Sequence, residues 1–394
     1  MLNKNGTREL AYVAEIKSID PIEGSDNCES ASIDGWHVMV RKGIHHVGDK
    51  CVYFEVDSKL DTTKECFAFL EKCHGKIKTQ KYTFGGKGLF YSQGLIMTLQ
   101  DCGLDEDKYN VGDFLTEILE VKYADEEDNK RKEVKEYNNT FKKIKKLKII
   151  RWIMRYEWGR KLIFKLFGVK KKKSEYPWFV IKTDEERCQN LPQRVWEDKA
   201  QTYEISEKVD GASTTVAIER QKKGYKLWIC SRNVVIWDSN TKKVKQGGYY
   251  KDLPTNPFVH SADMYKICEF LEDYMNKHED TKWAYLQGET YGEGIQKRTY
   301  NCKGTDFRAF ILTDDAGRYS YSRMKEVLDV YGIPTVPILK TGYILTNCDD
   351  LIKLAGSEKS QIDGGMREGI VLRNEQNTAF SFKAVDPSFL VKYH

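Results

Sequence analysis

The sequence predicts an α+β protein in which a small N-terminal β-barrel precedes a larger domain of antiparallel sheets with flanking helices. First, short strand-like runs separated by turn residues fill the first 121 residues. Second, strand-like and helical patterns are mixed in residues 176–394. Third, 394 residues suffice for two or three domains, and 40% hydrophobic with 31% charged residues is typical of a globular chain.

Residues 1–121 are expected to form an OB-fold domain, because about five short strand-like runs are typical of such a small β-barrel. The runs are LAYVAEIKSI, WHVMVRKG, KCVYFEVDS, GLFYSQGLIMTL and DFLTEILEV. Barrels of this type often bind nucleic acid. From these residues alone, a barrel that only packs against the neighbouring domain fits equally well.

Residues 122–175 form a basic segment, expected to be a helical linker or insert. Residues 122–173 carry 19 Lys and Arg against 7 Asp and Glu. Apolar residues recur at helical spacing, as at Ile144, Leu147 and Ile150, which predicts one or two amphipathic helices. Three roles stay open: contact with RNA phosphates, attachment to an anionic membrane surface, and a charged linker docked by its apolar stripe.

Residues 176–394 are expected to form one α+β domain with a sheet at its core. Strand-like runs include TTVAIER, KLWICSRN, WAYLQGETYG, FRAFILTD, GIVLRN and TAFSFKAV. Helices are expected at 184–199, 261–278, 322–331 and 348–355.

Other features bear on the compartment. The N-terminal stretch MLNKNGTREL lacks an apolar segment and no run of 18 apolar residues occurs, so neither a secretory signal nor a membrane span is expected. The ten cysteines are scattered without a C-x-x-C pair, which indicates reduced thiols and a cytoplasmic or nuclear protein. Cys66, Cys73 and His74 lack a second ligand pair at zinc-finger spacing, so zinc is not expected there.

The main chemical motif is Lys208-x-Asp210-Gly211, at the end of the strand-like run YEISEKVDG. Alone it is weak evidence, because these residues are common and an exposed lysine at a strand end would explain it. Further blocks follow within strand-like runs or at their ends: Ser231-Arg232-Asn233, Gln287-Gly288-Glu289, Phe307-Arg308-Ala309-Phe310, Arg367-Glu368-Gly369-Ile370-Val371 and Phe382-Lys383-Ala384. Each block is weak evidence alone, but their occurrence together in this order is specific.

These blocks resemble those of the covalent nucleotidyltransferase superfamily of nucleic acid ligases and mRNA capping enzymes. Residues 176–190 and 292–296 are similar to segments of ATP-dependent RNA ligases of the Deinococcus and Naegleria type, which carry an OB domain before the catalytic domain. Capping enzymes and DNA ligases carry it afterwards. Only eleven residues follow Lys383, so the order of domains favours the RNA ligase type. The resemblance implies a nucleotidyltransferase (ATP-grasp-like ligase) domain at 176–394.

The resemblance also implies that Lys208 attacks the α-phosphate of ATP and expels pyrophosphate, leaving a lysyl-AMP phosphoramidate. The amine must first lose its proton, although a free lysine has a pKa of about 10.4. Lys383, Arg232 and a divalent metal would lower the pKa of Lys208, and Lys383 would share in catalysis. Three carboxylates are expected to hold Mg²⁺ or Mn²⁺ through its waters: Asp210, Glu289 and Glu368.

The nucleotide is expected to contact further residues of these blocks. Gly211 would let the chain turn after the lysine strand. Phe310 would stack on adenine, with Phe307 as the alternative and core packing as the ordinary role of either ring. Arg232 would contact the ribose or the RNA 3′ end rather than form only a surface salt bridge, and Glu207 would meet the adenine edge or lie exposed. The nucleotide-binding set is Glu207, Lys208, Gly211, Arg232, Glu289, Phe310 and Lys383.

The expected function is ATP-dependent joining of RNA 3′-OH and 5′-phosphate ends through lysyl-AMP and an adenylylated RNA 5′ end, at nicks in duplexes during RNA repair. A capping-type guanylyltransferase and a non-catalytic RNA-binding protein on a ligase scaffold are the alternatives. The last block departs from the family, which often has K-x-K where this chain has Ser381-Phe382-Lys383, so Lys392 or Lys297 would help to neutralise the triphosphate. The expected partner is RNA, and the protein is expected to be a monomer.

Overall fold

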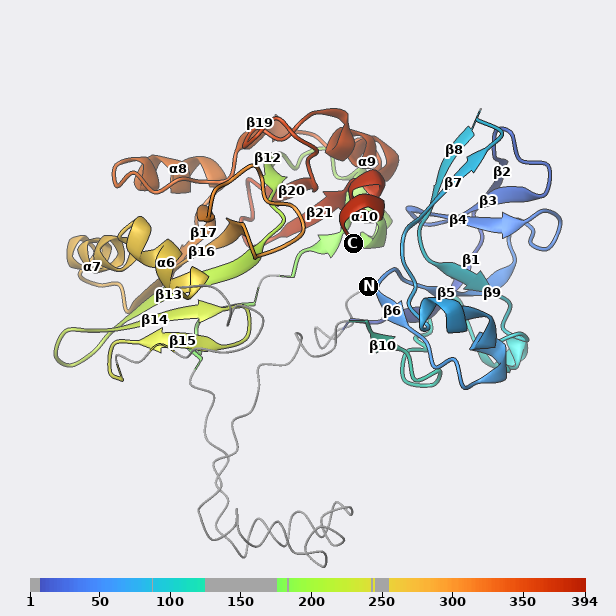
Figure 1. Ribbon diagram of the computed structural model, residues 1–394, viewed down its shortest axis with the longest axis horizontal. Coiled ribbons are helices and arrows are strands. Elements are labelled where there is room, and N and C mark those ends of the chain that lie inside the picture. The colour runs from blue at the N-terminus through green and yellow to red at the C-terminus, as the bar shows by residue number, and fades with distance from the viewer. Residues whose placement is uncertain (1–7, 87, 125–175, 183, 242–243, 245–254) are drawn as a thin grey trace, which may run out of the picture.

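The computed structural model describes residues 8–86, 88–124, 176–182, 184–241, 244 and 255–394 (Figure 1). The helices expected in the basic segment fall on 125–175, outside these residues, and stay a prediction. Among the described helices, none is both long and apolar enough to cross a membrane.

The N-terminal domain consists of short antiparallel strands, drawn in blue to teal in Figure 1. They are β1 (Ala11–Glu15), β2 (Ser18–Pro21), β3 (Cys28–Ile33), β4 (Trp36–Arg41), β5 (Lys50–Phe54), β6 (Ser58–Lys59), β7 (Gln80–Phe84), β8 (Gly88–Ser92), β9 (Leu95–Met97) and β10 (Lys122–Tyr123). Hydrogen bonds join them in the orders β1-β5-β9, β2-β3-β4, β7-β8 and β10-β6. Two 3₁₀ helices, Glu65–Cys73 and Glu106–Lys108, complete the domain.

The last expected strand of this domain, DFLTEILEV, forms only at its start. Phe114 makes an antiparallel bridge with Tyr12, and the Leu115 N–H donates to the Ala11 carbonyl at 2.8 Å. Residues 116–120 form a turn, and Glu120 has a left-handed backbone with φ of 58°. Leu119 still packs in the core around Val52 and Phe54, so the apolar spacing beyond Leu115 reflects burial rather than strand pairing.

The C-terminal domain is built on two sheets. Its strands are β11 (Glu186–Arg187), β12 (Tyr203–Lys208), β13 (Ala212–Arg220), β14 (Tyr225–Ser231), β15 (Val235–Asp238), β16 (Trp283–Gly292), β17 (Thr305–Asp314), β18 (Gly317–Arg318), β19 (Ile338–Tyr343), β20 (Gly369–Asn374) and β21 (Ser381–Val385). The antiparallel sheet has the order β15-β14-β13-β16-β17-β18, and the mixed sheet the order β11-β21-β20-β12-β19, with β11 parallel to β21. Since β12 leads directly into β13, the sheets meet just after Lys208.

Helices flank these sheets: α5 (Gln193–Glu197), α6 (Pro257–Met264), α7 (Ile267–Lys277), α8 (Tyr321–Asp329), α9 (Cys348–Ser357) and α10 (Pro387–Tyr393). Of the expected helix at 184–199, only α5 is α-helical, because residues 186–187 join a sheet, residues 188–190 form a 3₁₀ turn, and Pro192 precedes α5. The expected helix at 261–278 is two helices, separated at Lys266 by a left-handed backbone with φ of 48°.

The two domains contact each other through the segment around β11. The Trp36 indole donates to Asn190 Oδ1 at 2.9 Å, and the Asn190 amide donates to Glu55 Oε1 at 2.6 Å. Arg187 donates to Asp57 at 3.3 Å. Because Arg187 is the register partner of Lys383 in the mixed sheet, the N-terminal domain is anchored beside the strand that carries Lys383.

Candidate functional site

Lys208 lies at the end of β12, where the mixed sheet opens onto the junction with β13. The strand is buried along most of its length and pairs with β20, so that Lys208 lies opposite Gly369. This register places Glu368, the residue just before β20, beside the amine. The Lys208 Nζ donates to Glu368 Oε1 at 2.7 Å, and the Glu368 side chain is only 7% exposed.

The electrostatics of this pair keep the amine protonated. Burial by itself lowers the pKa of Lys208, but the Glu368 carboxylate, with smaller contributions from Glu289 and Asp210, raises that pKa above its usual value. The carboxylates therefore oppose deprotonation of the amine.

Asp210 and Glu289 share this crowded negative environment. Burial and the neighbouring Glu368 charge raise the pKa of Asp210 to about 7, with Lys208 acting in the opposite direction. Burial also raises the pKa of Glu289 to about 8, although Lys208 lowers it. Carboxyl groups with such pKa values bind protons near neutral pH unless a cation replaces them.

The chain bends at Gly211, as expected, and this residue has a second role. It is not among the residues with a left-handed backbone. An added Cβ would lie 2.4 Å from the Thr290 carbonyl oxygen and 2.8 Å from the Glu289 Cγ. The missing side chain therefore allows the lysine motif to approach β16 closely, which sets Glu289 beside Asp210 and Lys208.

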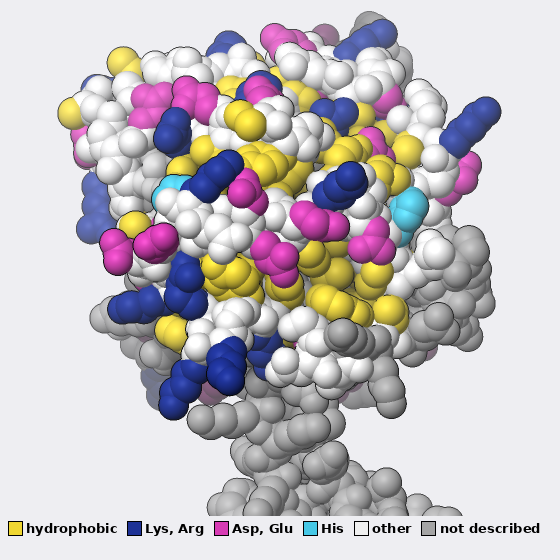
Figure 2. Space-filling model, turned by 90° about the vertical axis from the view of Figure 1, so that its left-hand side faces the viewer, with side chains coloured by type: hydrophobic (Ala, Val, Ile, Leu, Met, Phe, Trp, Pro, Cys, Tyr) yellow, Lys and Arg dark blue, Asp and Glu magenta, His cyan; other side chains and the backbone are white. Residues whose placement is uncertain are grey.

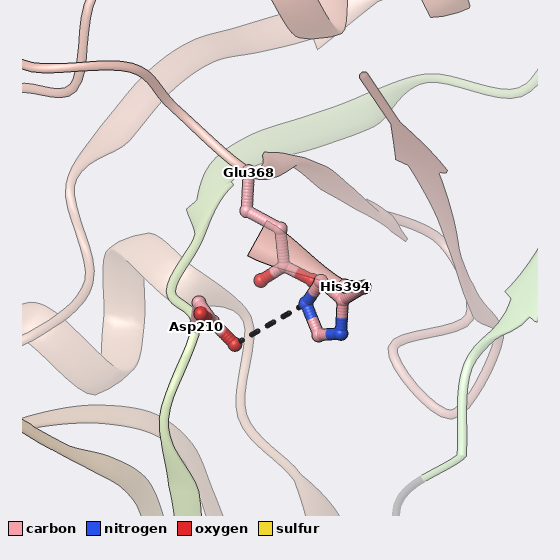
Figure 3. Close-up of side chains that lie close together, drawn as sticks. All are labelled: Asp210, Glu368 and His394. Atoms are coloured by element: carbon pink, nitrogen blue, oxygen red, sulfur yellow. Dashed lines mark ion pairs between the residues drawn. The ribbon is translucent and has the colours of Figure 1, made fainter. Parts of the chain in front are cut away.

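A histidine that the motifs did not indicate joins two of the predicted metal ligands. Figure 3 shows the His394 ring beside the carboxylates of Asp210 and Glu368, and the His394 Nε2 lies 3.7 Å from Asp210 Oδ1. One ligand atom from each of the three residues lies within 4.8 Å of the others. Glu289 is not part of this set. Burial lowers the pKa of His394, which favours a neutral imidazole.

Three cations converge on Asp184. Asp184 Oδ1 lies 3.4 Å from Arg232, 3.9 Å from Lys383 and 4.0 Å from Arg8 of the N-terminal domain. Burial would raise the pKa of Asp184, but these cations hold it below its usual value. Burial, helped by nearby Arg187, lowers the pKa of Lys383 to about 8.

The two candidates for contact with adenine occupy different environments. Glu207 is buried, which rules out the exposed alternative, and its carboxylate accepts from the Ser360 hydroxyl and from the Gln361 N–H at 2.8 Å. Phe310 is half-buried at the irregularity where β17 shifts register against β16. Such a bulge re-aims a side chain. Phe307 lies in the core, 1% exposed.

The motifs left several residues without an assigned role. Tyr300 accepts from the Asp210 N–H at 2.7 Å, and its ring lies 3.8 Å from the Arg298 guanidinium. Arg318 donates to the Ser381 hydroxyl at 3.3 Å, which places a cation beside the position that departs from K-x-K. These residues follow no spacing rule, since separate strands and loops bring them together. Asp184 lies within the segment 176–190 that is similar to RNA ligases, and this resemblance was the only signal for it in the sequence.

Comparisons with known proteins agree with this architecture. Residues 201–394 match a family model described as RNA ligase, and residues 10–97 match a model of an OB-fold domain. No curated protein matches the chain. Solved structures of Naegleria gruberi RNA ligase are similar over 98% of this chain and 99% of theirs. A variant with ATP and Mn has 25% identity and a TM-score of 0.69, and the enzyme with PPi has 26% identity and a TM-score of 0.66.

A further variant of the Naegleria enzyme, with AMP and Mn, is similar at 25% identity and a TM-score of 0.68, over 98% of this chain and 99% of its own. The likeness includes both domains in the expected order, with the OB-fold domain before the ligase domain. The family predicted from the ordered motifs is confirmed. The chain therefore belongs to the RNA ligase family, and the protein is an RNA ligase with an N-terminal OB-fold domain.

Proposed function

We propose that this RNA ligase uses ATP to join RNA 3′-OH and 5′-phosphate ends at nicks in duplexes, through lysyl-AMP and an adenylylated RNA 5′ end. One observation carries the proposal: the Lys208 amine is held 2.7 Å from Glu368 in a carboxylate cluster, and lies near enough to Lys383 for its charge to help lower the pKa of that lysine. The similar Naegleria structures contain ATP with Mn and AMP with Mn, which supports the same nucleotide here.

In the first step, the lone pair of Lys208 Nζ forms a bond to the α-phosphorus, and the bond from that phosphorus to the pyrophosphate oxygen breaks. The ammonium proton must leave beforehand. Glu368 Oε1 is within hydrogen-bond reach and can accept it. The pyrophosphate departs with the electron pair of the broken bond.

The carboxylate set fits Mg²⁺ or Mn²⁺. Asp210, Glu289 and Glu368 offer the hard oxygen donors that these ions prefer, and the buried Glu368 Oε2 has no hydrogen-bond partner among the described residues. A bound ion would supply positive charge against the phosphates as pyrophosphate leaves.

The cations around Asp184 fit a triphosphate. Lys383 and Arg232 share this carboxylate, so phosphate oxygens can replace it as their partner. Arg8 also pairs with the buried Glu55 at 3.4 Å, which holds it beside Asp184. Arg8 is proposed to join Lys383 and Arg232 in the phosphate site and to compensate for the uncharged Ser381.

The adenine contacts are proposed for Phe310 and Glu207. Phe310 is only half-buried, so its ring offers a surface for stacking. The carboxylate of Glu207 is fixed by Ser360 and Gln361, yet each oxygen keeps a further lone pair for the adenine amino group.

After lysyl-AMP forms, AMP passes to the RNA 5′-phosphate, and attack by the 3′-OH expels it. The OB-fold domain and the basic segment 122–175 are proposed to hold the flanking duplex through its phosphates. On the described part of the face in Figure 2, acidic and basic side chains are interspersed, which is unlike a phosphate-binding surface. We propose a cytoplasmic or nuclear monomer.

The proposal is tested by incubating the full chain with ATP labelled at the α-phosphate and Mg²⁺ or Mn²⁺. A labelled protein band is expected for the wild type and not for Lys208→Ala, while Lys222→Ala, in an exposed turn, keeps the label. Label on Lys208→Ala, or none on the wild type, would overturn the proposal. Labelled GTP tests the guanylyltransferase alternative, and nicked duplexes with RNA or DNA on each strand test the substrate.

A further inference from the structure

The cluster of Asp210, Glu368 and His394 has the composition of a mixed nitrogen and oxygen metal site (Figure 3). Two ligand atoms that lie about 2.1 Å from one ion are roughly 3.0–4.2 Å apart. The 3.7 Å between His394 Nε2 and Asp210 Oδ1 falls in this interval. The ligand atoms of all three residues lie within 4.8 Å of one another, so the more distant ones would have to approach by up to about 0.6 Å to bind one ion.

A second observation points to a ligand at this place. Glu368 is 5% exposed, and its Oε2 has no hydrogen-bond partner among the residues that the structure describes, while Oε1 binds Lys208. A buried carboxylate oxygen without a donor is costly, because it has lost its water without replacement. A cation between Glu368, Asp210 and His394 would satisfy it.

The position of His394 is fixed by both domains. It follows α10, which is capped by the Asp386 side chain and anchored by the buried Phe389. The His394 N–H donates to the Leu390 carbonyl at 3.0 Å, and the His394 carbonyl accepts from Lys78 of the N-terminal domain at 2.8 Å. These contacts fix the backbone of His394 beside the carboxylates.

We propose that His394 is a direct ligand of the divalent ion at the ligase site, and that its nitrogen makes the site prefer first-row transition ions to Mg²⁺. This inference rests on the proposed function, which places an ion on the carboxylates alone. An all-oxygen set suits Mg²⁺, whereas an imidazole nitrogen adds affinity for softer divalent ions. The His394 side chain is 46% exposed, so an ion can reach it from solvent.

The test measures ion binding to the full chain without ATP. Mn²⁺ is titrated while the six-line resonance of free Mn²⁺ is followed, and Mg²⁺ is measured by competition. His394→Ala is expected to weaken Mn²⁺ binding roughly tenfold and Mg²⁺ binding much less. Pulsed electron resonance is expected to show coupling of bound Mn²⁺ to a ¹⁴N nucleus in the wild type, and to lose it in His394→Ala.

The matched control is His46→Ala. His46 also lies beside a carboxylate, 3.5 Å from Asp49, but on an exposed part of the N-terminal domain. The His46→Ala variant is expected to keep both the Mn²⁺ affinity and the ¹⁴N coupling of the wild type. Unchanged Mn²⁺ affinity and coupling in His394→Ala would overturn the inference, as would an equal loss in His46→Ala. Absence of the ATP-derived label on wild-type protein would instead count against the proposed function, so the two failures are distinguishable.

Discussion

Replacing Lys383 by methionine is expected to make the ligand-free protein more stable while it removes ligase activity. The Lys383 side chain is 16% exposed, and burial with nearby Arg187 lowers its pKa from 10.5 to about 8. A difference of this size corresponds to roughly 3 kcal/mol of penalty for the charged form. This net penalty already includes the attraction to Asp184, and the buried methionine side chain keeps the packing. We therefore expect Lys383→Met to raise the free energy of unfolding by about 1–3 kcal/mol near pH 7.

The pH dependence gives this prediction its sign. Below pH 8, Lys383 is charged in both the folded and the unfolded protein, so the folded state carries the full penalty. Between about pH 8 and pH 10.5 the unfolded chain binds more protons than the folded one, and wild-type stability rises with pH. The advantage of Lys383→Met should therefore shrink as pH rises through this interval.

Urea denaturation of both proteins at about pH 7 and about pH 9.5 measures this difference. Lys222→Met, in the exposed turn after β13, serves as the control and should change neither the stability nor its pH dependence. ATP should stabilise the wild type more than Lys383→Met, because the proposed phosphate site loses one of its three cations. A variant that is less stable than the wild type by the same amount at both pH values would refute the reasoning.

Three further substitutions test the supports of the site. Asn190→Ala removes the 2.6 Å hydrogen bond to the fully buried Glu55 and should lower the free energy of unfolding by about 2 kcal/mol in urea denaturation. Tyr300→Phe removes the acceptor of the Asp210 N–H, and should cost about 1 kcal/mol and slow labelling by ATP in a time course. Gly211→Ala places a methyl group 2.4 Å from a backbone carbonyl of β16, and should lower both the melting temperature and the extent of labelling.

The sequence was sufficient for the residues that occupy strand ends. Lys208 ends β12, and Glu368 immediately precedes β20, so antiparallel pairing of these two strands alone brings them together. Gln287-Gly288-Glu289 lies within β16, which pairs with the strand that follows the lysine motif. Such motifs are readable because a strand fixes where its end residues lie relative to its neighbour.

Residues placed by loops or by the other domain could not be predicted in this way. Asp184 collects three cations from two domains, and His394 reaches the carboxylates only because α10 and Lys78 position it. Neither contact has a characteristic spacing along the chain. The segment 184–199 misled for a similar reason, since Asn190 and Arg187 are committed to contacts with the N-terminal domain rather than to a helix.

The arrangement couples the reactivity of Lys208 to the occupancy of its site. The carboxylates proposed to hold the ion are the same groups that raise the pKa of the amine, with Glu368 in direct contact at 2.7 Å. While they are bare, their negative charge stabilises the ammonium, which has no lone pair for attack. A divalent ion would cancel that charge, and the cations released from Asp184 would turn to the triphosphate. Under the proposed function, the amine would therefore become nucleophilic only once ion and nucleotide are both bound.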